Sequence, residues 1–252
     1  MKILLTLSYL GTGFSGYQVQ KSARTVQGEL NAAARALFGY DCDITGCSRT
    51  DAGVHANMFC AAVTKKGESH LETHISEDKI PAAMNAHLPA DVSVTRAEWV
   101  SDEFHPRYDV KYKEYVYMID NRQARNPFTE GRAWHIPYAI DDSAIDKMNR
   151  AAQCFVGKHD FSAFMASGST VESTVRDVQY AEVVKNSDQI VFKVAADGFL
   201  YNMVRIMTGT LVAVAQGRID PDDVPDIIES KDRQRAGITA PAQGLYLNRV
   251  VY

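Results

Sequence analysis

Cysteine is scarce in this chain of 252 residues, which has four thiols and no Cys-x-x-Cys pair. That scarcity excludes a disulfide-stapled secreted domain and favours a reducing cytoplasm. Long apolar runs are missing as well, so no segment approaches the length of a membrane span. Residues Met1 to Leu7 form a short apolar run with no small-residue cleavage site after it, and we interpret them as part of a first strand, not as a signal peptide.

An excess of positive charge is also missing. Lys and Arg number 27, Asp and Glu number 31, and the formal net charge is -4. The overall charge therefore does not indicate a nucleic-acid partner, although phosphate binding depends on where the cations gather and not on their sum. The apolar fraction of 46% is that of an ordinary globular protein.

A dinucleotide-binding loop is suggested by Gly11 to Gly16, which fits G-x-G-x-x-G after an apolar run. That fingerprint requires a helix to open directly at the glycines, so that its N-terminus faces the pyrophosphate. Here the helical spacing of Val26, Leu30, Ala33 and Leu37 begins only after Thr25, a plausible N-cap. A nucleotide-dependent oxidoreductase is thus a weaker alternative, and saturable NAD(P) binding would be its sign.

Metal motifs are incomplete. His70, Glu72 and His74 alternate with other residues, but the order His-Glu-x-x-His of zinc proteases is absent. A zinc deaminase also needs Pro-Cys-x-x-Cys downstream, which the sequence lacks. We expect both histidines to lie in a solvated loop.

The richest chemistry lies between Ile44 and Ala56, where small and polar residues surround Asp51. Gly46 and Gly53 permit positive φ angles that residues with a Cβ avoid, so a turn here can present the carboxylate of Asp51 in a cleft. Such a group serves as a nucleophile, a general base or the partner of a buried cation. The simpler alternative is an Asp that hydrogen-bonds its own backbone in a turn.

Hydrophobic periodicity predicts an α+β protein with long antiparallel strands, few helices and two halves, residues 1–100 and 101–252. A long strand should reach Ile119, and its apolar positions change phase after Tyr112, which indicates a bulge or a strand covered on both faces. We expect Tyr108 and Tyr117 to pack across strands. Further elements are predicted as strands over 3–10, 57–64, 91–100, 175–184 and 189–196, and as helices from Ser76 and from Gly198 to Ala215.

The octapeptide Arg-Thr-Asp-Ala-Gly-Val-His-Ala, residues 49–56, resembles the signature of the TruA family of tRNA pseudouridine synthases. Ser48 stands where that family usually has Gly. Shorter matches follow in the family's order along the whole chain: Phe-His-x-Arg ending at Arg107, Tyr-x-Tyr beginning at Tyr115, Met-Val-Arg ending at Arg205, and the closing Gly-Leu-Tyr-Leu that contains Leu245.

The resemblance implies two ferredoxin- or RRM-like halves, a joined sheet with helices on one face, and a central active-site cleft. It implies that uridine becomes pseudouridine at positions 38–40 of the tRNA anticodon stem-loop, without metal or cofactor, in a cytoplasmic homodimer. Asp51 would be the catalytic carboxylate, with Tyr115 and Arg205 beside it, and pairing with Arg205 would lower the pKa of Asp51. The residues expected to bind substrate are Arg49, Tyr115, Lys21, Arg24, His55, Arg107 and Leu245.

Two questions stay open at this point. Asp51 fits the role of nucleophile as well as that of base at the sugar. A non-catalytic relative that binds tRNA without modifying it is the second alternative, and the presence of Asp51, Tyr115 and Arg205 argues against it.

Overall fold

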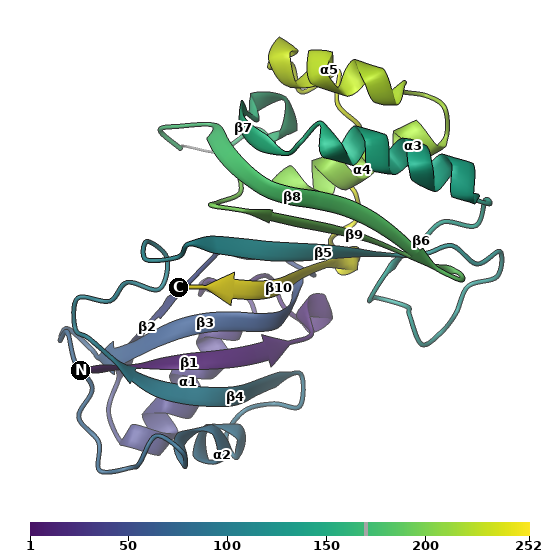
Figure 1. Cartoon of the computed structure of the whole chain (residues 1–252). Coiled ribbons are helices and arrows are strands. Elements are labelled where there is room, and N and C mark those ends of the chain that lie inside the picture. The colour runs from purple at the N-terminus through teal and green to yellow at the C-terminus, as the bar shows by residue number, and fades with distance from the viewer. Residues whose placement is uncertain (169–170) are drawn as a thin grey trace. The chain divides into compact units, whose positions relative to one another are not determined.

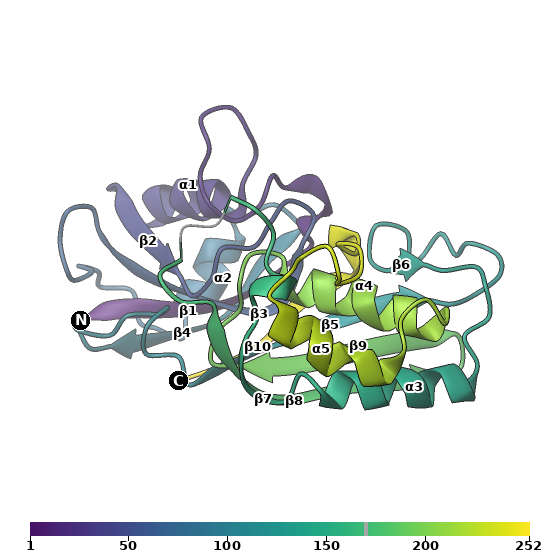
Figure 2. The ribbon, with the colours of Figure 1, turned by 90° about the horizontal axis from the view of Figure 1, so that it is seen from above.

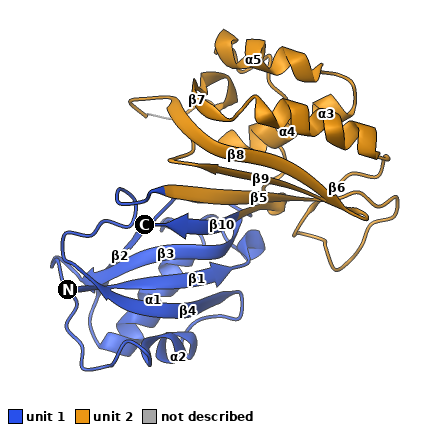
Figure 3. Ribbon diagram, viewed as in Figure 1, with its two compact units in different colours: residues 1–111, 247–252 blue, residues 112–246 orange. Residues whose placement is uncertain are grey.

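The computed structural model describes residues 1–168 and 171–252, which form two compact units (Figure 1, Figure 3). Unit 1 holds Met1–Lys111 and Leu247–Tyr252, and unit 2 holds Tyr112–Tyr246. The boundary predicted at residue 100 lies before this change of unit. The predicted second half also includes the closing strand, most of which packs in unit 1.

Unit 1 is built on a sheet in which β1 lies between β4 and β3, β2 pairs with β3, and β10 lies on the other side of β3. The pairs of β1 with β3, β1 with β4 and β2 with β3 are all antiparallel. The strands are β1 (Lys2–Tyr9), β2 (Cys42–Gly46), β3 (His55–Lys65), β4 (Val92–Val100) and β10 (Leu245–Val251).

Two helices cover one face of this sheet, α1 (Val26–Phe38) and α2 (Ile80–Asn85) (Figure 1). The predicted start of α1 is confirmed, since the Thr25 hydroxyl accepts a hydrogen bond from the amide of Gly28. Helix α2 is shorter than predicted. Ser76 lies outside it, because the helix begins beside a proline at one of its first positions, where a missing N–H costs nothing.

The glycine run after β1 does not open a helix. It forms a short 3-10 turn, η1 (Gly11–Gly13), and α1 begins only after Thr25. Strand β1 also pairs antiparallel with both neighbours, whereas a dinucleotide fold needs parallel strands joined by crossover helices. The structure therefore agrees with the prediction that this run is not a dinucleotide site.

Unit 2 has a sheet in the order β5-β9-β8-β7, with the short β6 paired parallel to β5. Its strands are β5 (Tyr112–Asp120), β6 (Trp134–His135), β7 (Gly157–Asp160), β8 (Val175–Asn186) and β9 (Gln189–Ala196). Its helices, which lie on one side of that sheet (Figure 2), are α3 (Asp142–Gln153), α4 (Met203–Ala215) and α5 (Val224–Ser230). Three further 3-10 turns are η2 (Ser162–Phe164), η3 (Pro221–Asp223) and η4 (Ala242–Gly244).

The α+β class and the mostly antiparallel strands are confirmed, but the predicted bulge in the long strand is wrong. Strand β5 begins at Tyr112, and its register with β9 runs unbroken from Lys113 opposite Ala196 to Asp120 opposite Gln189. The other predicted alternative, a strand covered on both faces, is confirmed, because the successive side chains of Tyr115, Val116 and Tyr117 are all buried. Tyr117 is fully buried, as expected, whereas Tyr108 lies before the strand and is 75% exposed.

No helix among residues 1–168 and 171–252 combines the length and apolar character that crossing a membrane requires.

Helix α4 meets the loop that follows α5 backbone to backbone. A Cβ on Gly209 would lie 1.8 Å from the carbonyl oxygen of Ile238, and a Cβ on Gly237 would lie 2.4 Å from the backbone of Gly209. The amide of Gly237 donates to the Thr210 hydroxyl at 2.9 Å, and the Arg233 guanidinium donates to the carbonyl of Gly237 at 2.8 Å. Only glycine at both contact points allows this approach.

Replacing Gly209→Ala should therefore separate the loop from α4 and lower the free energy of unfolding by about 3 kcal/mol, as overpacking against backbone does. Gly198→Ala is the control, because its Cβ would meet only the flexible end of Arg176, at 3.3 Å, and should cost less than about 1 kcal/mol. Urea unfolding of the full chain measures both values. Equal losses in the two variants would contradict the close-approach explanation.

A second network orders the segment between β5 and β6. The carboxylate of Asp120, 4% exposed, accepts from the Arg122 guanidinium at 2.8 and 2.7 Å and from the Thr129 hydroxyl at 2.5 Å. These hydrogen bonds, among which the one from Arg122 has the largest effect, lower the pKa of Asp120 to about 2. The ionised form is thus stabilised in the folded chain relative to the unfolded one.

Because the folded pKa is depressed, this stabilisation is present above the unfolded value near 4 and is lost as the pH falls toward 2. We expect Asp120→Asn to be less stable than the parent by about 2 kcal/mol at pH 7 and by about half of that at pH 3. Chemical unfolding of the two proteins at both pH values measures the difference. A gap of constant size would refute the assignment.

Candidate active site

The Asp51 loop joins β2 to β3 within unit 1 and forms the predicted turn. Gly53 has φ +81°, in the left-handed region, and the amide of Val54 donates to the carbonyl of Asp51 at 3.1 Å. Asp51 is half-buried, the preceding Thr50 is buried and Arg49 is exposed. The loop thus holds the carboxylate at the edge of the protein with a cation two residues away.

Gly46 is needed for a reason other than the one predicted. It is the last residue of β2 and does not have a positive φ angle, but a Cβ there would lie 2.7 Å from the ring of Tyr17 and 2.8 Å from Phe59. The rings of Tyr17 and Phe59 stack with centroids 4.4 Å apart. Gly46 therefore leaves space for the stacked rings of Tyr17 and Phe59, which pack at the start of the Asp51 loop.

The segment after β1 packs directly on the Asp51 loop. The amide of Tyr17 donates to the carbonyl of Thr50 at 3.1 Å, and the hydroxyls of Tyr9 and Thr50 lie 2.7 Å apart. A Cβ on Gly11 would lie 2.0 Å from the carbonyl oxygen of Val54, and one on Gly16, where φ is +96°, would lie 2.8 Å from that of Thr50. Gly11 and Gly16, which fit the dinucleotide-binding pattern in the sequence, therefore allow the segment after β1 to pack against the Asp51 loop.

His55 was expected to bind substrate, but the structure buries it completely, with 0% of its surface exposed. Its Nδ1 accepts a hydrogen bond from the amide of Gly11 at 2.8 Å. A side chain without exposed surface cannot contact a bound nucleotide, so His55 supports the loop from behind. The octapeptide alone did not distinguish these roles, because a buried and a ligand-facing histidine look the same in sequence.

The cationic side chains predicted to bind substrate differ in their surroundings. Arg24 donates to both oxygens of Asp91, at 2.7 and 2.9 Å, and to Glu29 at 2.8 Å. Both carboxylates raise the pKa of Arg24, and Asp91 has the larger effect. A phosphate would have to compete with both of them for the guanidinium. Lys21 is exposed in the turn before α1. Arg49 and Arg107 line one pocket of about 220 Å³ within unit 1.

The other predicted residues belong to unit 2. Tyr115, on β5, is 6% exposed and meets the ring of Phe199 edge-on with centroids 5.0 Å apart. Leu245 begins β10 and is also 6% exposed. These two side chains present little surface, so any contact with a substrate is limited to an edge of the ring or a methyl group.

Arg205 projects from an otherwise apolar helix, α4, and is held by its own unit. Its Nε donates to the carbonyl of Ala240 at 2.7 Å, and its Nη1 donates to the Asn202 side chain at 2.7 Å. The amide of Ala240 in turn donates to the carbonyl of Arg205 at 3.1 Å. Arg205 is half-buried in this arrangement, which fixes the guanidinium in one orientation.

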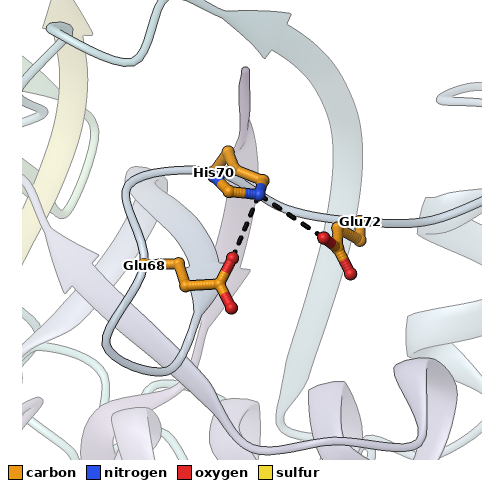
Figure 4. A group of neighbouring side chains, drawn as sticks. All are labelled: Glu68, His70 and Glu72. Atoms are coloured by element: carbon orange, nitrogen blue, oxygen red, sulfur yellow. Dashed lines mark ion pairs between the residues drawn. The ribbon is translucent and has the colours of Figure 1, made fainter.

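Among the residues that the structure describes, one cluster offers metal-ligand atoms. The Nε2 of His70 lies 3.0 Å from Glu68 and 3.6 Å from Glu72 (Figure 4). The Lys65 ammonium already pairs with both carboxylates, at 2.9 and 3.4 Å, so a metal ion would compete with a resident cation. His74, which the sequence pattern placed beside this group, is not among its members. The cluster is a partly exposed set of ion pairs.

Comparison with known proteins identifies the family to which the chain belongs. A family model described as tRNA pseudouridine synthase matches residues 6–109 and 151–252. The chain belongs to the tRNA pseudouridine synthase family. The match includes the Asp51 loop, the cation at Arg107 and Arg205, whereas Tyr115 lies between the two matched segments.

Individual members of the family resemble the chain over its full length. A tRNA pseudouridine synthase A of Thermoanaerobacter sp. (strain X514) is 45% identical over 99% of both chains. The enzyme of the same name from Ruminiclostridium cellulolyticum is 43% identical, and that from Bacillus pumilus 41%, each over 100% of this chain and 99% of its own. A solved chain of a Cbf5-Nop10-Gar1 complex aligns with 97% of this chain and 48% of its own, at 14% identity and a TM-score of 0.40, which is too distant to support an inference.

The buried position of His55 predicts a structural effect. His55→Ala should leave the Gly11 amide without its acceptor and open a cavity, at a cost of about 2–4 kcal/mol in the free energy of unfolding. His55→Asn keeps an acceptor near the position of Nδ1 and should recover part of that loss. Urea unfolding combined with the KM for tRNA distinguishes the roles, since a substrate-binding histidine would raise KM without a loss of stability.

Proposed function

We propose that the chain isomerises uridine to pseudouridine at positions 38–40 of the tRNA anticodon arm, with Asp51 as the catalytic carboxylate. As a member of the tRNA pseudouridine synthase family, the chain converts uridine to pseudouridine in tRNA. The observation that carries the assignment to Asp51 is its position. It is half-buried on a loop whose backbone is bonded to the segment after β1, inside the octapeptide that resembles the TruA signature.

The reaction needs a positioned acid–base group and no exchange of electrons. The N1–C1′ bond of the nucleoside breaks, the uracil turns, and a C5–C1′ bond forms. The proton on C5 leaves, and N1 gains one, so atoms balance within the nucleoside and solvent. A permanent carboxylate suits either of two steps, attack on the nucleoside or removal of a proton at the sugar.

Two residues of unit 2 complete the proposal. Arg205, whose guanidinium donates to Asn202 and Ala240, is by the TruA resemblance the cation proposed to keep the catalytic carboxylate ionised. Tyr115 would contact the uracil and take part in removing the C5 proton. The uridine has to leave its base stack to reach Asp51, and the exposed Arg49 would fill the vacated space or hold a phosphate.

The remaining parts of the proposal concern assembly and location. We infer a homodimer, so that one tRNA can contact two subunits, and a cytoplasmic enzyme that works without a metal or cofactor. The four free thiols support a reducing compartment.

Asp51→Asn should lower pseudouridine formation by about 10³-fold or more, because the neutral amide can neither attack nor accept a proton. Binding of tRNA should remain within about threefold of the parent, since the amide has the same shape. Asp146→Asn, an exposed acid on α3, is the matched control and should leave turnover unchanged. Nucleotide-resolution pseudouridine mapping on tRNA, with and without protein, measures both turnover and position.

Turnover by Asp51→Asn at the parent rate would overturn the catalytic assignment. Modification outside positions 38–40 would leave the reaction intact and overturn only the proposed position. Binding of tRNA by the parent protein with no change in its pseudouridine content would favour the non-catalytic alternative.

A further inference from the structure

A stacked aromatic pair, the half-buried His105 and the exposed Tyr108, lies in the turn after β4. The rings of His105 and Tyr108 stack with centroids 4.2 Å apart and planes 26° apart. Tyr108 is 75% exposed, so one ring face rests on the imidazole and the other is open to water. This large apolar surface is not part of the core, in contrast to the cross-strand packing that the sequence predicts for Tyr108.

The turn holds this pair before any ligand arrives. The amide of Arg107 donates to Nδ1 of His105 at 3.1 Å, and the amide of His105 donates to the Asp109 carboxylate at 2.9 Å. The Tyr252 hydroxyl donates to the carbonyl of Pro106 at 2.9 Å and ties the turn to the end of unit 1. A ring that is already oriented loses little conformational freedom when another ring stacks on it.

The pair borders the pocket of about 220 Å³ described above, which lies entirely within unit 1. Its volume is below the roughly 300–1,000 Å³ of sites for drug-sized molecules, so it suits a single base better than a larger ligand. Besides His105 and Tyr108, the lining includes Arg49, Arg107, Gln18 and Thr45. Two guanidiniums, an amide, a hydroxyl and a stacked ring pair are the groups that bind a phosphate, a base edge and a base face.

A buried group at this pocket also lacks a partner. Tyr17 lines the pocket and is 3% exposed, and its hydroxyl has no hydrogen-bond partner within the part of the chain that the structure describes. Buried hydroxyls are normally satisfied, and an exception at a pocket indicates a missing ligand or water.

We propose that this pocket binds one unpaired nucleotide of the tRNA next to the isomerised uridine, with its base stacked on Tyr108 and its phosphate held by Arg107 and Arg49. The inference rests on the proposed function, because the occupant belongs to the same tRNA. Asp51 does not line the pocket, so the occupant is not the target uridine. Arg49 precedes Asp51 by two residues, at most about 7 Å of chain, which places the occupant within one or two nucleotides of the target.

A set of Tyr108 variants in the full chain tests the stacking. Tyr108→Ala should raise the Kd for unmodified tRNA by about 5- to 150-fold, the range for losing one base–aromatic stack. Tyr108→Phe and Tyr108→Trp keep the ring face and should stay within about threefold of the parent. The loss in Tyr108→Ala should appear as a higher protein concentration for the half-maximal single-turnover rate, because Tyr108 contributes to binding.

Parent-like binding by Tyr108→Ala would overturn the proposal, as would a loss of equal size in Tyr108→Phe, which would assign the effect to the hydroxyl. Thermal unfolding and sedimentation of Tyr108→Ala are expected to match the parent. A smaller assembly that accompanies the loss of binding would instead assign Tyr108 to a contact between subunits and would also overturn it.

Photo-crosslinking locates the occupant. Ultraviolet irradiation of the complex with tRNA, followed by mass spectrometry, should join the peptide containing His105 and Tyr108 to a nucleotide flanking the modified position. A crosslink only to the modified uridine, or only to the paired stem, would contradict the proposal. The same binding series in the Asp51→Asn background separates the two inferences: failure of the proposed function appears as retained turnover there, whereas failure here appears as unchanged affinity in Tyr108→Ala.

Discussion

The close approach of two backbones determines the local structure around Asp51. Gly11 and Gly16 lie so near the carbonyls of Val54 and Thr50 that a Cβ on either would overlap them. The hydrogen bond between Tyr17 and Thr50 is possible only at this distance. A loop rich in small and polar residues would otherwise be mobile, because it buries little apolar surface of its own. Contact with the segment after β1 removes that freedom and fixes the backbone that carries the Asp51 side chain.

A similar close approach of two backbone segments occurs in unit 2 around Arg205. Gly209 and Gly237 allow the loop after α5 to lie on α4, and this contact brings the carbonyl of Ala240 to the guanidinium of Arg205. A long cationic side chain would lose considerable rotamer entropy if it were ordered only on substrate binding. Each unit therefore presents one proposed catalytic side chain on a backbone segment whose close packing depends on glycines elsewhere in the chain.

Cations near the Asp51 loop divide into two kinds, a distinction that net charge does not express. Arg24 is paired with Asp91 and Glu29, whereas Arg49 and Arg107 line a pocket beside the exposed ring of Tyr108. In the proposed complex, this division lets a chain with a net charge of -4 bind an RNA. The phosphate contacts need only a few local cations, and aromatic stacking supplies affinity that does not depend on charge.

The sequence by itself determined the α+β class and the start of α1 after Thr25, because capping residues and local periodicity act over a few neighbouring positions. It also determined the family, through the octapeptide around Asp51. It did not determine what lies against those elements. Only the tertiary structure decided that His55 is buried, that Gly46 accommodates a ring, and that Tyr108 is open to water. These outcomes depend on partners distant along the chain, such as Gly11 for His55 and Tyr252 for the turn that carries Tyr108, and no local pattern encodes such contacts.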